Sequence, residues 1–345
     1  MKAVAIREHG DLGCLRMEDL PEPKALRGEA VVAVRAAALN HLDVWVRRGG
    51  RGPALQKPHI LGSDASGVVA QLGEGVTRLK VGDEVVLNPG LSCGVCENCV
   101  RGEHSECERF GIVGLSSLGT FAERLAVSAD NLYPKPAHLS FGEAAALPLA
   151  YVTAWRMLMT RAQLCCGETV LIHGIGGGVA LAALQFSKIA GAKTIVTSSS
   201  DEKLSRARGL GADFTVNYHK TSDVAKEVGK ITNGRGVDVA VNTVGAAAWP
   251  IDFDCLRRGG KLVICGVTTG AAAQTNLQAL YWKQLTVLGS TLGSRGDFER
   301  MIQAAAASGL KPVIDSVYPL EDFREAMEKM ESGLQFGKLV LKIPD

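Results

Sequence analysis

The sequence lacks a long apolar run and an excess of charge of either sign. No window approaches about 18 uninterrupted apolar residues, and the opening MKAVAIREHG lacks the apolar stretch of a signal peptide. Basic residues number 38 and acidic residues 36, and neither sign gathers into a run. Binding to nucleic acid or to a membrane is therefore not expected. We expect a soluble, cytoplasmic protein that acts on a small-molecule substrate.

Aromatic residues are also scarce, at 5% of the chain, whereas 40 of the 345 residues are glycine. This glycine content suits a fold with many tight turns, and an apolar fraction of 46% argues against disorder. At about 150 residues per domain, the length predicts two domains.

The first part of the chain is typical of an all-β barrel. Short alternating or apolar runs at 29–35, 65–71, 84–87 and 121–127 are separated by Gly, Pro and Asp. Later segments predict helices at 298–308 and 320–331 and a final strand at 338–343.

A different rhythm begins at residue 169. Apolar strands recur every 20 to 24 residues, at 169–173, 193–197, 213–217, 237–241, 261–265 and 285–289. Helix-length segments such as 179–190 and 201–208 lie between them. The pattern predicts an α/β fold with a doubly wound parallel sheet of six strands.

The first of these strands leads into a glycine-rich turn and then a helix. The turn comprises Gly174, Gly176, Gly177, Gly178 and Val179, separated only by Ile175. Glycines let the backbone approach a pyrophosphate, and the N–H groups at a helix start favour its negative charge. The spacing fits G-x-x-G-x-x-A better than G-x-G-x-x-G, but the context predicts a dinucleotide site.

The end of the second strand bears on which dinucleotide binds. NAD-specific proteins usually present an acid there to the ribose, whereas this strand ends in hydroxyl residues at 197–200. Ser198 followed by Lys203, with Arg206 one turn later, leaves room and charge for a 2′-phosphate. We predict NADPH, with NADH as the alternative because Asp201 is close by.

Four of the nine cysteines crowd into the lobe 93–107: Cys93, Cys96, Cys99 and Cys107. Four thiolates satisfy the tetrahedral preference of zinc with no open position, so we predict one structural zinc per chain. The bacterial iron–sulfur run closes with a shorter gap and a Cys-Pro, whereas Cys107 is followed by Glu108. His104 is expected at the surface, and Cys265 and the Cys165–Cys166 pair as buried thiols.

These features together resemble the medium-chain dehydrogenase/reductase superfamily, in its alcohol dehydrogenase and quinone oxidoreductase branches. The matching segments are Asn40–Asp43, Leu61–Val69, Val81–Val85, Leu147–Trp155, Leu288–Ser290 and Gly337–Val340. The resemblance implies a GroES-like β-barrel catalytic domain (1–150 and 293–345) and a Rossmann domain (151–292). It also implies hydride transfer in the cleft between them and a homodimer or homotetramer, often joined through the last Rossmann strand.

One departure concerns a second, catalytic zinc. Zinc alcohol dehydrogenases bind it through a Cys, the His of Gly-His-Glu and a later Cys or acid, and these positions are here Asn40, Ser63 and Leu149. None is a good zinc ligand, so we expect no catalytic zinc; the alternative is an unusual set such as His41, His59 and Asp64. The Ser/Thr of the family's proton relay is Leu42.

This departure changes the expected chemistry. Reduction of a simple ketone places an alkoxide in the transition state, which needs a Lewis acid or a proton donor. Reduction of a conjugated C=C spreads the charge into an enolate, which one or two neutral donors can stabilise. We therefore predict an NADPH-dependent reductase of enones, quinones or enoyl-CoA thioesters. An alcohol or aldehyde dehydrogenase and a non-catalytic NADPH-binding protein are the alternatives.

The quinone oxidoreductase branch shares Asn40 and the Asp of Gly-Ser-Asp. Its two tyrosines after that Asn are replaced here by Trp45 and Arg51, which puts quinone specificity in doubt. Arg51 could instead meet an anionic substrate such as an acyl-CoA phosphate, or simply be solvated.

The predicted catalytic residues are Asn40 and Ser63 as donors, Asp64 as a holder of polar groups, His41 as a ribose contact or proton relay, and Tyr151 as a carbonyl donor. The resemblance places Thr153 near the nicotinamide, Lys203 and Tyr218 near the adenosine phosphate, and the Gly266 and Val267 backbone opposite the carboxamide. Plainer roles stay open: a turn for Asn40, space filling for Ser63, packing for Tyr151 and His173.

Overall fold

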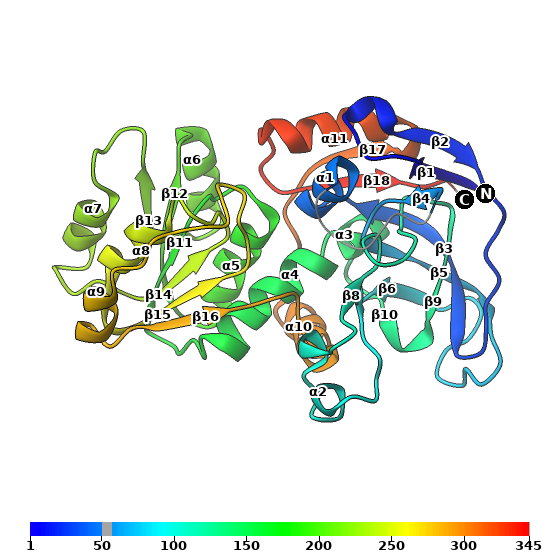
Figure 1. Ribbon diagram of the computed structural model, residues 1–345, viewed down its shortest axis with the longest axis horizontal. Coiled ribbons are helices and arrows are strands. Elements are labelled where there is room, and N and C mark those ends of the chain that lie inside the picture. The colour runs from blue at the N-terminus through cyan, green and yellow to red at the C-terminus, as the bar shows by residue number, and fades with distance from the viewer. Residues whose placement is uncertain (50–56, 345) are drawn as a thin grey trace. The chain divides into compact units, whose positions relative to one another are not determined.

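The computed structural model describes residues 1–49 and 57–344, so Arg51 lies outside the described residues. By its internal contacts the chain divides into two compact units. The first is Met1–Ala150 together with Ser294–Asp345, and the second is Tyr151–Gly293. Each unit has its own main sheet (Figure 1).

The first unit is built on a seven-stranded sheet in the order β10-β6-β5-β3-β18-β17, with β9 also paired to β3. These strands are β3 (Glu29–Ala38), β5 (Asp64–Leu72), β6 (Glu84–Leu87), β9 (Arg124–Ser128), β10 (Leu132–Pro134), β17 (Ile314–Pro319) and β18 (Lys338–Lys342). Smaller sheets join β1 (Lys2–Ile6), β2 (Arg16–Asp19) and β4 (His59–Ile60), and β7 (Gly90–Leu91) with β8 (Gly111–Ile112).

The helices of this unit vary in length, from four residues in α2 to 14 in α10. They are α1 (His41–Arg48), α2 (Glu97–Val100), α3 (Phe141–Ala145), α10 (Arg295–Ser308) and α11 (Phe323–Ser332). The core joins residues far apart in the chain, since Val32 and Val34 of β3 are buried in one cluster with Leu339 and Leu341 of β18. In both strands the buried positions of this cluster alternate, as expected for one apolar face of a sheet.

The register of β3, β5 and β18 decides where the residues beside them lie. Ala38 of β3 pairs with Asp64 of β5 on one side and with Val340 of β18 on the other, both antiparallel. Asn40 follows Ala38 by two residues and Lys338 precedes Val340 by two. The register therefore continues to Asn40 opposite Lys338, two residues from the Ala38–Asp64 pair, and a bond from Leu39 N to Leu339 O (2.9 Å) continues the pairing.

The second unit is a parallel sheet of six strands in the order β13-β12-β11-β14-β15-β16. The strands are β11 (Thr169–Ile172), β12 (Lys193–Ser198), β13 (Phe214–Asn217), β14 (Val237–Asn242), β15 (Leu256–Ile264) and β16 (Thr286–Gly289). Its helices are α5 (Gly178–Ile189), α6 (Asp201–Gly209), α7 (Val224–Ile231), α8 (Trp249–Cys255) and α9 (Leu277–Trp282), and α4 (Pro148–Trp155) runs into it from the first unit. This order is typical of dinucleotide-binding sheets, and it confirms the predicted six-stranded sheet.

The structure differs from the sequence-based expectation at the start of β15 and in the burial of three cysteines. Strand β15 begins at Leu256, whereas the sequence predicts a start at 261. The prediction missed the first residues because 257–260 is Arg-Arg-Gly-Gly and shows no apolar alternation. Cys265, expected to be buried, is only partly buried. Cys165 and Cys166, also expected to be buried, are exposed. They lie in the turn that precedes β11, where Gly167 donates a backbone bond to Gly191 O.

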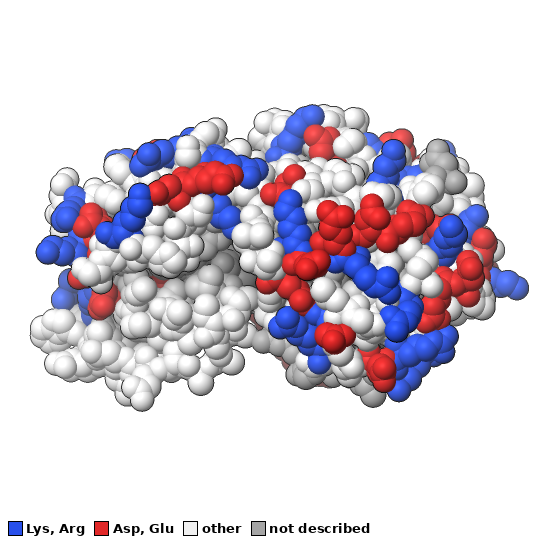
Figure 2. All heavy atoms as spheres, turned by 90° about the horizontal axis from the view of Figure 1, so that it is seen from above, with Lys and Arg blue, Asp and Glu red and all other residues white. Residues whose placement is uncertain are grey.

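The distribution of charged side chains on the surface agrees with the balanced charge of the sequence. On the face shown in Figure 2, acidic and basic side chains are interspersed rather than gathered by sign. Within residues 1–49 and 57–344, we find no helix with both the length and the apolar character needed to cross a bilayer.

Candidate functional site

A buried polar cluster lies beside β3, β5 and β18 of the first unit. The Asn40 amide donates from Nδ2 to Asp64 Oδ2 over 2.8 Å. The Lys338 ammonium donates to Asn40 Oδ1 (2.6 Å) and to Asp64 Oδ2 (2.9 Å). All three side chains are buried, with Lys338 only 3% exposed. A buried ammonium is costly without partners, and the carboxylate and the amide oxygen supply them.

The other oxygen of Asp64 ties the cluster to the start of α4. Asp64 Oδ1 accepts from the Leu149 backbone N–H over 2.8 Å. Asp64 therefore holds Asn40, Lys338 and the backbone at Leu149 together. Leu149 is one of the three positions where zinc alcohol dehydrogenases carry a ligand, and here it contributes only backbone to this contact.

A second carboxylate, Asp43, supports the backbone around the cluster. Its two oxygens accept from Asn40 N (2.7 Å) and Gly62 N (3.2 Å). Burial raises the pKa of the Asp43 carboxyl to about 7, and the nearby Asp64 charge adds to the rise while the Asn40 N–H opposes it. Gly62 has φ +97°, and a Cβ there would lie 2.3 Å from the Phe121 ring.

Ser63 lies between these residues in the chain and is fully buried. Its Oγ has no hydrogen-bond partner in the part of the chain that the structure describes. A buried hydroxyl without a partner is uncommon, and Ser187 Oγ of α5 is another such atom among the described residues. His41 starts α1 and stacks edge-on against Trp45, with ring centroids 5.1 Å apart.

The alternative zinc set of His41, His59 and Asp64 is not brought together. Among residues 1–49 and 57–344, the one group of three or more His, Cys, Asp or Glu placed to hold a metal is formed by cysteines. His59 Nε2 instead contacts Gly114 O at 2.9 Å.

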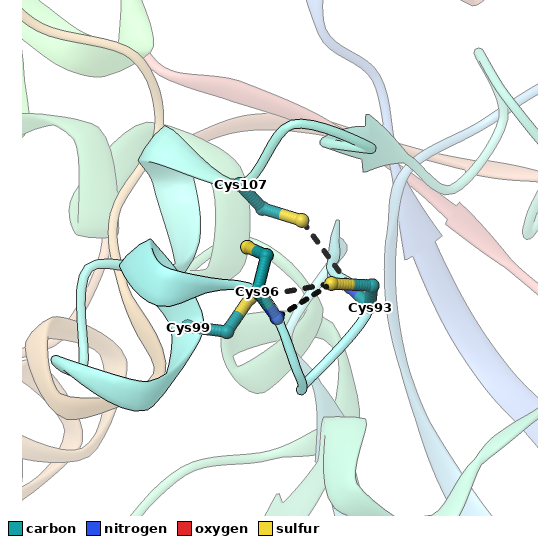
Figure 3. A group of neighbouring side chains, drawn as sticks. All are labelled: Cys93, Cys96, Cys99 and Cys107. Carbon is teal, nitrogen blue, oxygen red and sulfur yellow. Dashed lines mark hydrogen bonds between the residues drawn. The ribbon is translucent and has the colours of Figure 1, made fainter.

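That group consists of Cys93, Cys96, Cys99 and Cys107 (Figure 3). Their Sγ atoms all lie within 4.8 Å of one another. Backbone N–H groups point at the sulfurs: Cys96 N donates to Cys93 Sγ and Cys93 N to Cys107 Sγ, each over 3.3 Å. Backbone N–H groups, of Val95 first and then of Cys96, lower the pKa of Cys93 to about 6. Four converging thiols with N–H support fit a tetrahedral zinc.

The glycine-rich turn of the second unit joins β11 to α5. Gly174 has φ +67° and Gly176 φ +123°, conformations that L side chains rarely adopt. Gly177 is the N-cap of α5, and the helix begins at Gly178 and Val179. The first N–H groups of a helix have no partner within the helix, so this end fits a pyrophosphate.

Residues predicted at the adenosine phosphate lie at the ends of β12 and β13. Ser198 ends β12, and its carbonyl accepts from Tyr218 N over 3.1 Å. Lys203 lies in the first turn of α6, where its backbone N–H bonds to the N-cap Ser200. Asp201, the acid that kept NADH open, accepts from Asn217 and pairs with Lys220.

The remaining predicted cofactor contacts also lie in the second unit. The backbone at 266 closely approaches the end of β14, since a Cβ on Gly266 would lie 2.3 Å from Thr243 O. Likewise, a Cβ on Gly245 would lie 2.7 Å from Val267 Cα. Thr153 is buried on α4, and the Tyr151 hydroxyl donates to Gln185 Oε1 of α5 over 2.7 Å. The structure thus gives Tyr151 a protein partner.

His173 belongs to a buried network beneath the glycine turn. Its Nε2 contacts Asp252 Oδ1 (2.9 Å) and its Nδ1 contacts Thr197 Oγ1 (3.2 Å). The other Asp252 oxygen accepts from Asn242, whose own Oδ1 accepts from Gly245 N. His173 thus helps to hold the strand ends around the turn, a structural role consistent with packing.

Sequence reasoning missed Lys338 and Asp43 as members of the polar cluster. Both stand in segments that carry the family resemblance, Gly337–Val340 and Asn40–Asp43. A lysine flanked by the apolar run of a core strand was the available signal, because such a charge must find a buried partner.

Comparisons with known proteins agree with this architecture. The alcohol dehydrogenase GroES-like domain family matches residues 26–137, and the zinc-binding dehydrogenase family matches residues 178–307. A zinc-type alcohol dehydrogenase-like protein of Schizosaccharomyces pombe is 35% identical over 95% of each chain. A solved NAD-dependent alcohol dehydrogenase is 43% identical over the whole of both chains, with a TM-score of 0.96. An acryloyl-coenzyme A reductase of Metallosphaera sedula is 30% identical over 99% of each chain.

The fold and the two family matches define a protein with a GroES-like domain and a dinucleotide-binding domain. The relatives show that it is an oxidoreductase. The chain belongs to the medium-chain dehydrogenase/reductase family. This confirms the predicted fold class and identifies the protein as an enzyme.

Proposed function

We propose that the protein is an NADPH-dependent reductase of activated C=C bonds in enones, quinones or enoyl-CoA thioesters. The observation that carries this proposal is the chemistry of the side chains at the positions of the family's catalytic zinc ligands. Asn40, Ser63 and Leu149 offer a neutral amide, a hydroxyl and an aliphatic side chain there. Neutral donors suit an enolate oxygen, whose charge is delocalised, better than an alkoxide.

Two donors support this chemistry. One Asn40 amide hydrogen is committed to Asp64, and no residue in the described ranges accepts the other. The Ser63 hydroxyl likewise has no acceptor among those residues. Bound NADPH would supply the hydride to the β-carbon, while Asn40 and Ser63 stabilise the carbonyl oxygen as it gains charge. Water can then supply the proton to the α-carbon.

Backbone and side chains of the second unit would hold the cofactor. The turn at Gly174, Gly176 and Gly177 and the start of α5 fit the pyrophosphate. Ser198, Lys203 and Tyr218 would bind the 2′-phosphate side, and Thr153, Gly266 and Val267 the nicotinamide. The absence of an acid at the end of β12 is what favours NADPH over NADH.

We also propose one structural zinc per chain on Cys93, Cys96, Cys99 and Cys107. The donor set is closed, since four thiolates leave no position for substrate.

An assembly of two or four copies is proposed through the edge of the second unit's sheet. Strand β16 lies at one of the two edges of the described sheet, and the nearby helix α9 exposes Leu277, Tyr281 and Trp282, the last at 66%. Exposed apolar groups beside an unpaired edge are typical of an interface. Light scattering should give a dimer or tetramer that Trp282→Glu weakens, and a monomeric wild type would contradict the proposal.

Alcohol or aldehyde dehydrogenase activity is the second candidate, favoured by the 43% identity to an NAD-dependent alcohol dehydrogenase. The discriminating experiment follows NADPH consumption with enones, quinones and short enoyl-CoA thioesters, beside NADP-dependent oxidation of simple alcohols. Turnover confined to the unsaturated carbonyls supports the proposal. Turnover of alcohols alone would contradict it.

A further inference from the structure

We propose that Lys338 is a positioning residue that fixes the Asn40 amide and offsets the charge of Asp64, so that Asn40 can act as a donor to the substrate oxygen. This inference rests on the proposed function and assigns a role to a residue outside the predicted site. It starts from three contacts: Asn40 Nδ2 to Asp64, and Lys338 Nζ to both Asn40 Oδ1 and Asp64.

The contacts determine which way the amide faces. An ammonium can only donate and a carboxylate can only accept, so Oδ1 must face Lys338 and Nδ2 must face Asp64. The reversed amide would place NH₂ against the ammonium and the carbonyl oxygen against the carboxylate. Lys338 and Asp64 together therefore hold Nδ2, with its second hydrogen, in one orientation.

The ammonium also controls the electrostatics at Asn40. Without it, the charge of the buried Asp64 carboxylate would be met by two neutral donors, the Asn40 amide and the Leu149 N–H, and would oppose the negative charge that develops on the substrate oxygen. Lys338 neutralises that carboxylate and draws electron density toward Oδ1, which strengthens the remaining N–H as a donor. Charges act strongly here because all three side chains are shielded from water.

A purely structural ion pair accounts less well for the geometry. Such a pair needs only the contact between Lys338 and Asp64, yet the shorter of the two lysine contacts, 2.6 Å against 2.9 Å, is to Asn40. The arrangement is also rigid, since Lys338 and Asp64 are the first residues of β18 and β5, and both strands pair with β3. Strand-borne groups hold a donor more accurately than groups on loops.

A double-mutant cycle tests the inference with NADPH and an enone that the wild type reduces. Lys338→Met should lower kcat by about 10- to 100-fold and change KM by no more than about twofold, because the loss falls on the transition state. In the Asn40→Ala background, the same Lys338→Met change should lower kcat by less than about twofold, since the group through which Lys338 acts is gone. Lys338→Arg, which keeps the charge, should recover part of the kcat lost in Lys338→Met.

Equal losses from Lys338→Met in the wild-type and Asn40→Ala backgrounds would overturn the inference, as would an unchanged kcat in Lys338→Met. Thermal unfolding and NADPH binding, followed by fluorescence, show whether each variant is folded. If Lys338→Met does not fold, Asp64→Asn with Lys338→Met is compared with Asp64→Asn alone, which avoids an unpaired buried charge; a kcat loss is again expected.

The same assays separate this inference from the proposed function. Wild-type enzyme that reduces no unsaturated carbonyl would overturn both. Wild-type enzyme that reduces enones, together with a cycle showing no coupling between Lys338 and Asn40, would overturn only the role of Lys338.

Discussion

Lys203 and Lys226 occupy the same position in two successive helices of the dinucleotide-binding domain. Each is the third residue of its helix, and each donates its backbone N–H to the N-cap side chain, Ser200 Oγ at 3.3 Å and Asp223 Oδ1 at 2.9 Å. Their backbone settings match, but only Lys203 follows the end of β12, where the 2′-phosphate is proposed to bind.

This pair gives a matched test of cofactor preference. Lys203→Ala should raise the Kd for NADPH by about tenfold, the loss of one charge-assisted contact of about 1.5 kcal/mol, and leave the Kd for NADH nearly unchanged. Lys226→Ala should change neither. Titration of protein fluorescence with each nucleotide measures both constants, and equal affinity of the wild type for NADH and NADPH would refute the phosphate site.

Removal of the Ser63 hydroxyl should separate activity from stability. The buried Oγ has no partner among the described residues, so Ser63→Ala breaks no bond in the folded chain and should leave the melting temperature unchanged or higher. Loss of a donor to the enolate should lower kcat by about tenfold or more. Ser187 of α5 is also buried, and its Oγ has no partner within residues 1–49 and 57–344, so Ser187→Ala is the control that should keep both properties. Unchanged turnover in Ser63→Ala would remove this residue from the site.

Asp43 should make stability depend on pH. Its pKa rises from 3.8 to about 7 on folding, so below pH 3.8 both states hold the proton and the group has no effect. As pH rises toward 7 the unfolded chain ionises first, and the free energy of unfolding falls by a few kcal/mol, at about 1.4 kcal/mol per pKa unit.

Asp43→Asn removes this titration. Urea unfolding from pH 4.5 to 8 should show the stability of the wild type relative to Asp43→Asn declining with rising pH. Asp19→Asn, on the exposed part of β2, is the control and should run parallel to the wild type. A difference between wild type and Asp43→Asn that is constant across this range would contradict the raised pKa.

Metal analysis should find one zinc per chain. Cys107→Ser should lose the zinc and lower the melting temperature, because a closed thiolate site contributes directly to folding. Cys165→Ser, which changes an exposed thiol outside the group, should retain it. Two zincs per wild-type chain would show a second metal site and would undermine the argument from Asn40, Ser63 and Leu149.

The parts of this protein that could be predicted are those formed by residues close together in the sequence. The apolar strands of the second unit recur at a regular spacing, and each lies where its run of Val, Ile and Leu predicts, apart from the early start of β15 at Leu256. The four cysteines fall within fifteen residues, so a small lobe suffices to bring them together.

The polar cluster could not be predicted in the same way. Asn40 and Lys338 lie 298 positions apart, and their contact depends on the pairing of β18 with β3. No local sequence pattern indicates which strand β18 pairs with, so the sequence around Lys338 predicts only that it begins a strand. Likewise, the raised pKa of Asp43 arises from tertiary burial, whereas its position in α1 suggests only a helix-start acid.

The return of β18 to the first sheet also sets an order of assembly during synthesis. Asn40 and Asp64 are synthesised early, and the whole second unit follows. Lys338, whose ammonium balances the charge of Asp64, leaves the ribosome only afterwards. Until then the nascent first unit carries a carboxylate without its ammonium and a sheet without β17 and β18. The inserted second unit has all six of its strands by that time, so it can fold while the first unit still awaits its last strands.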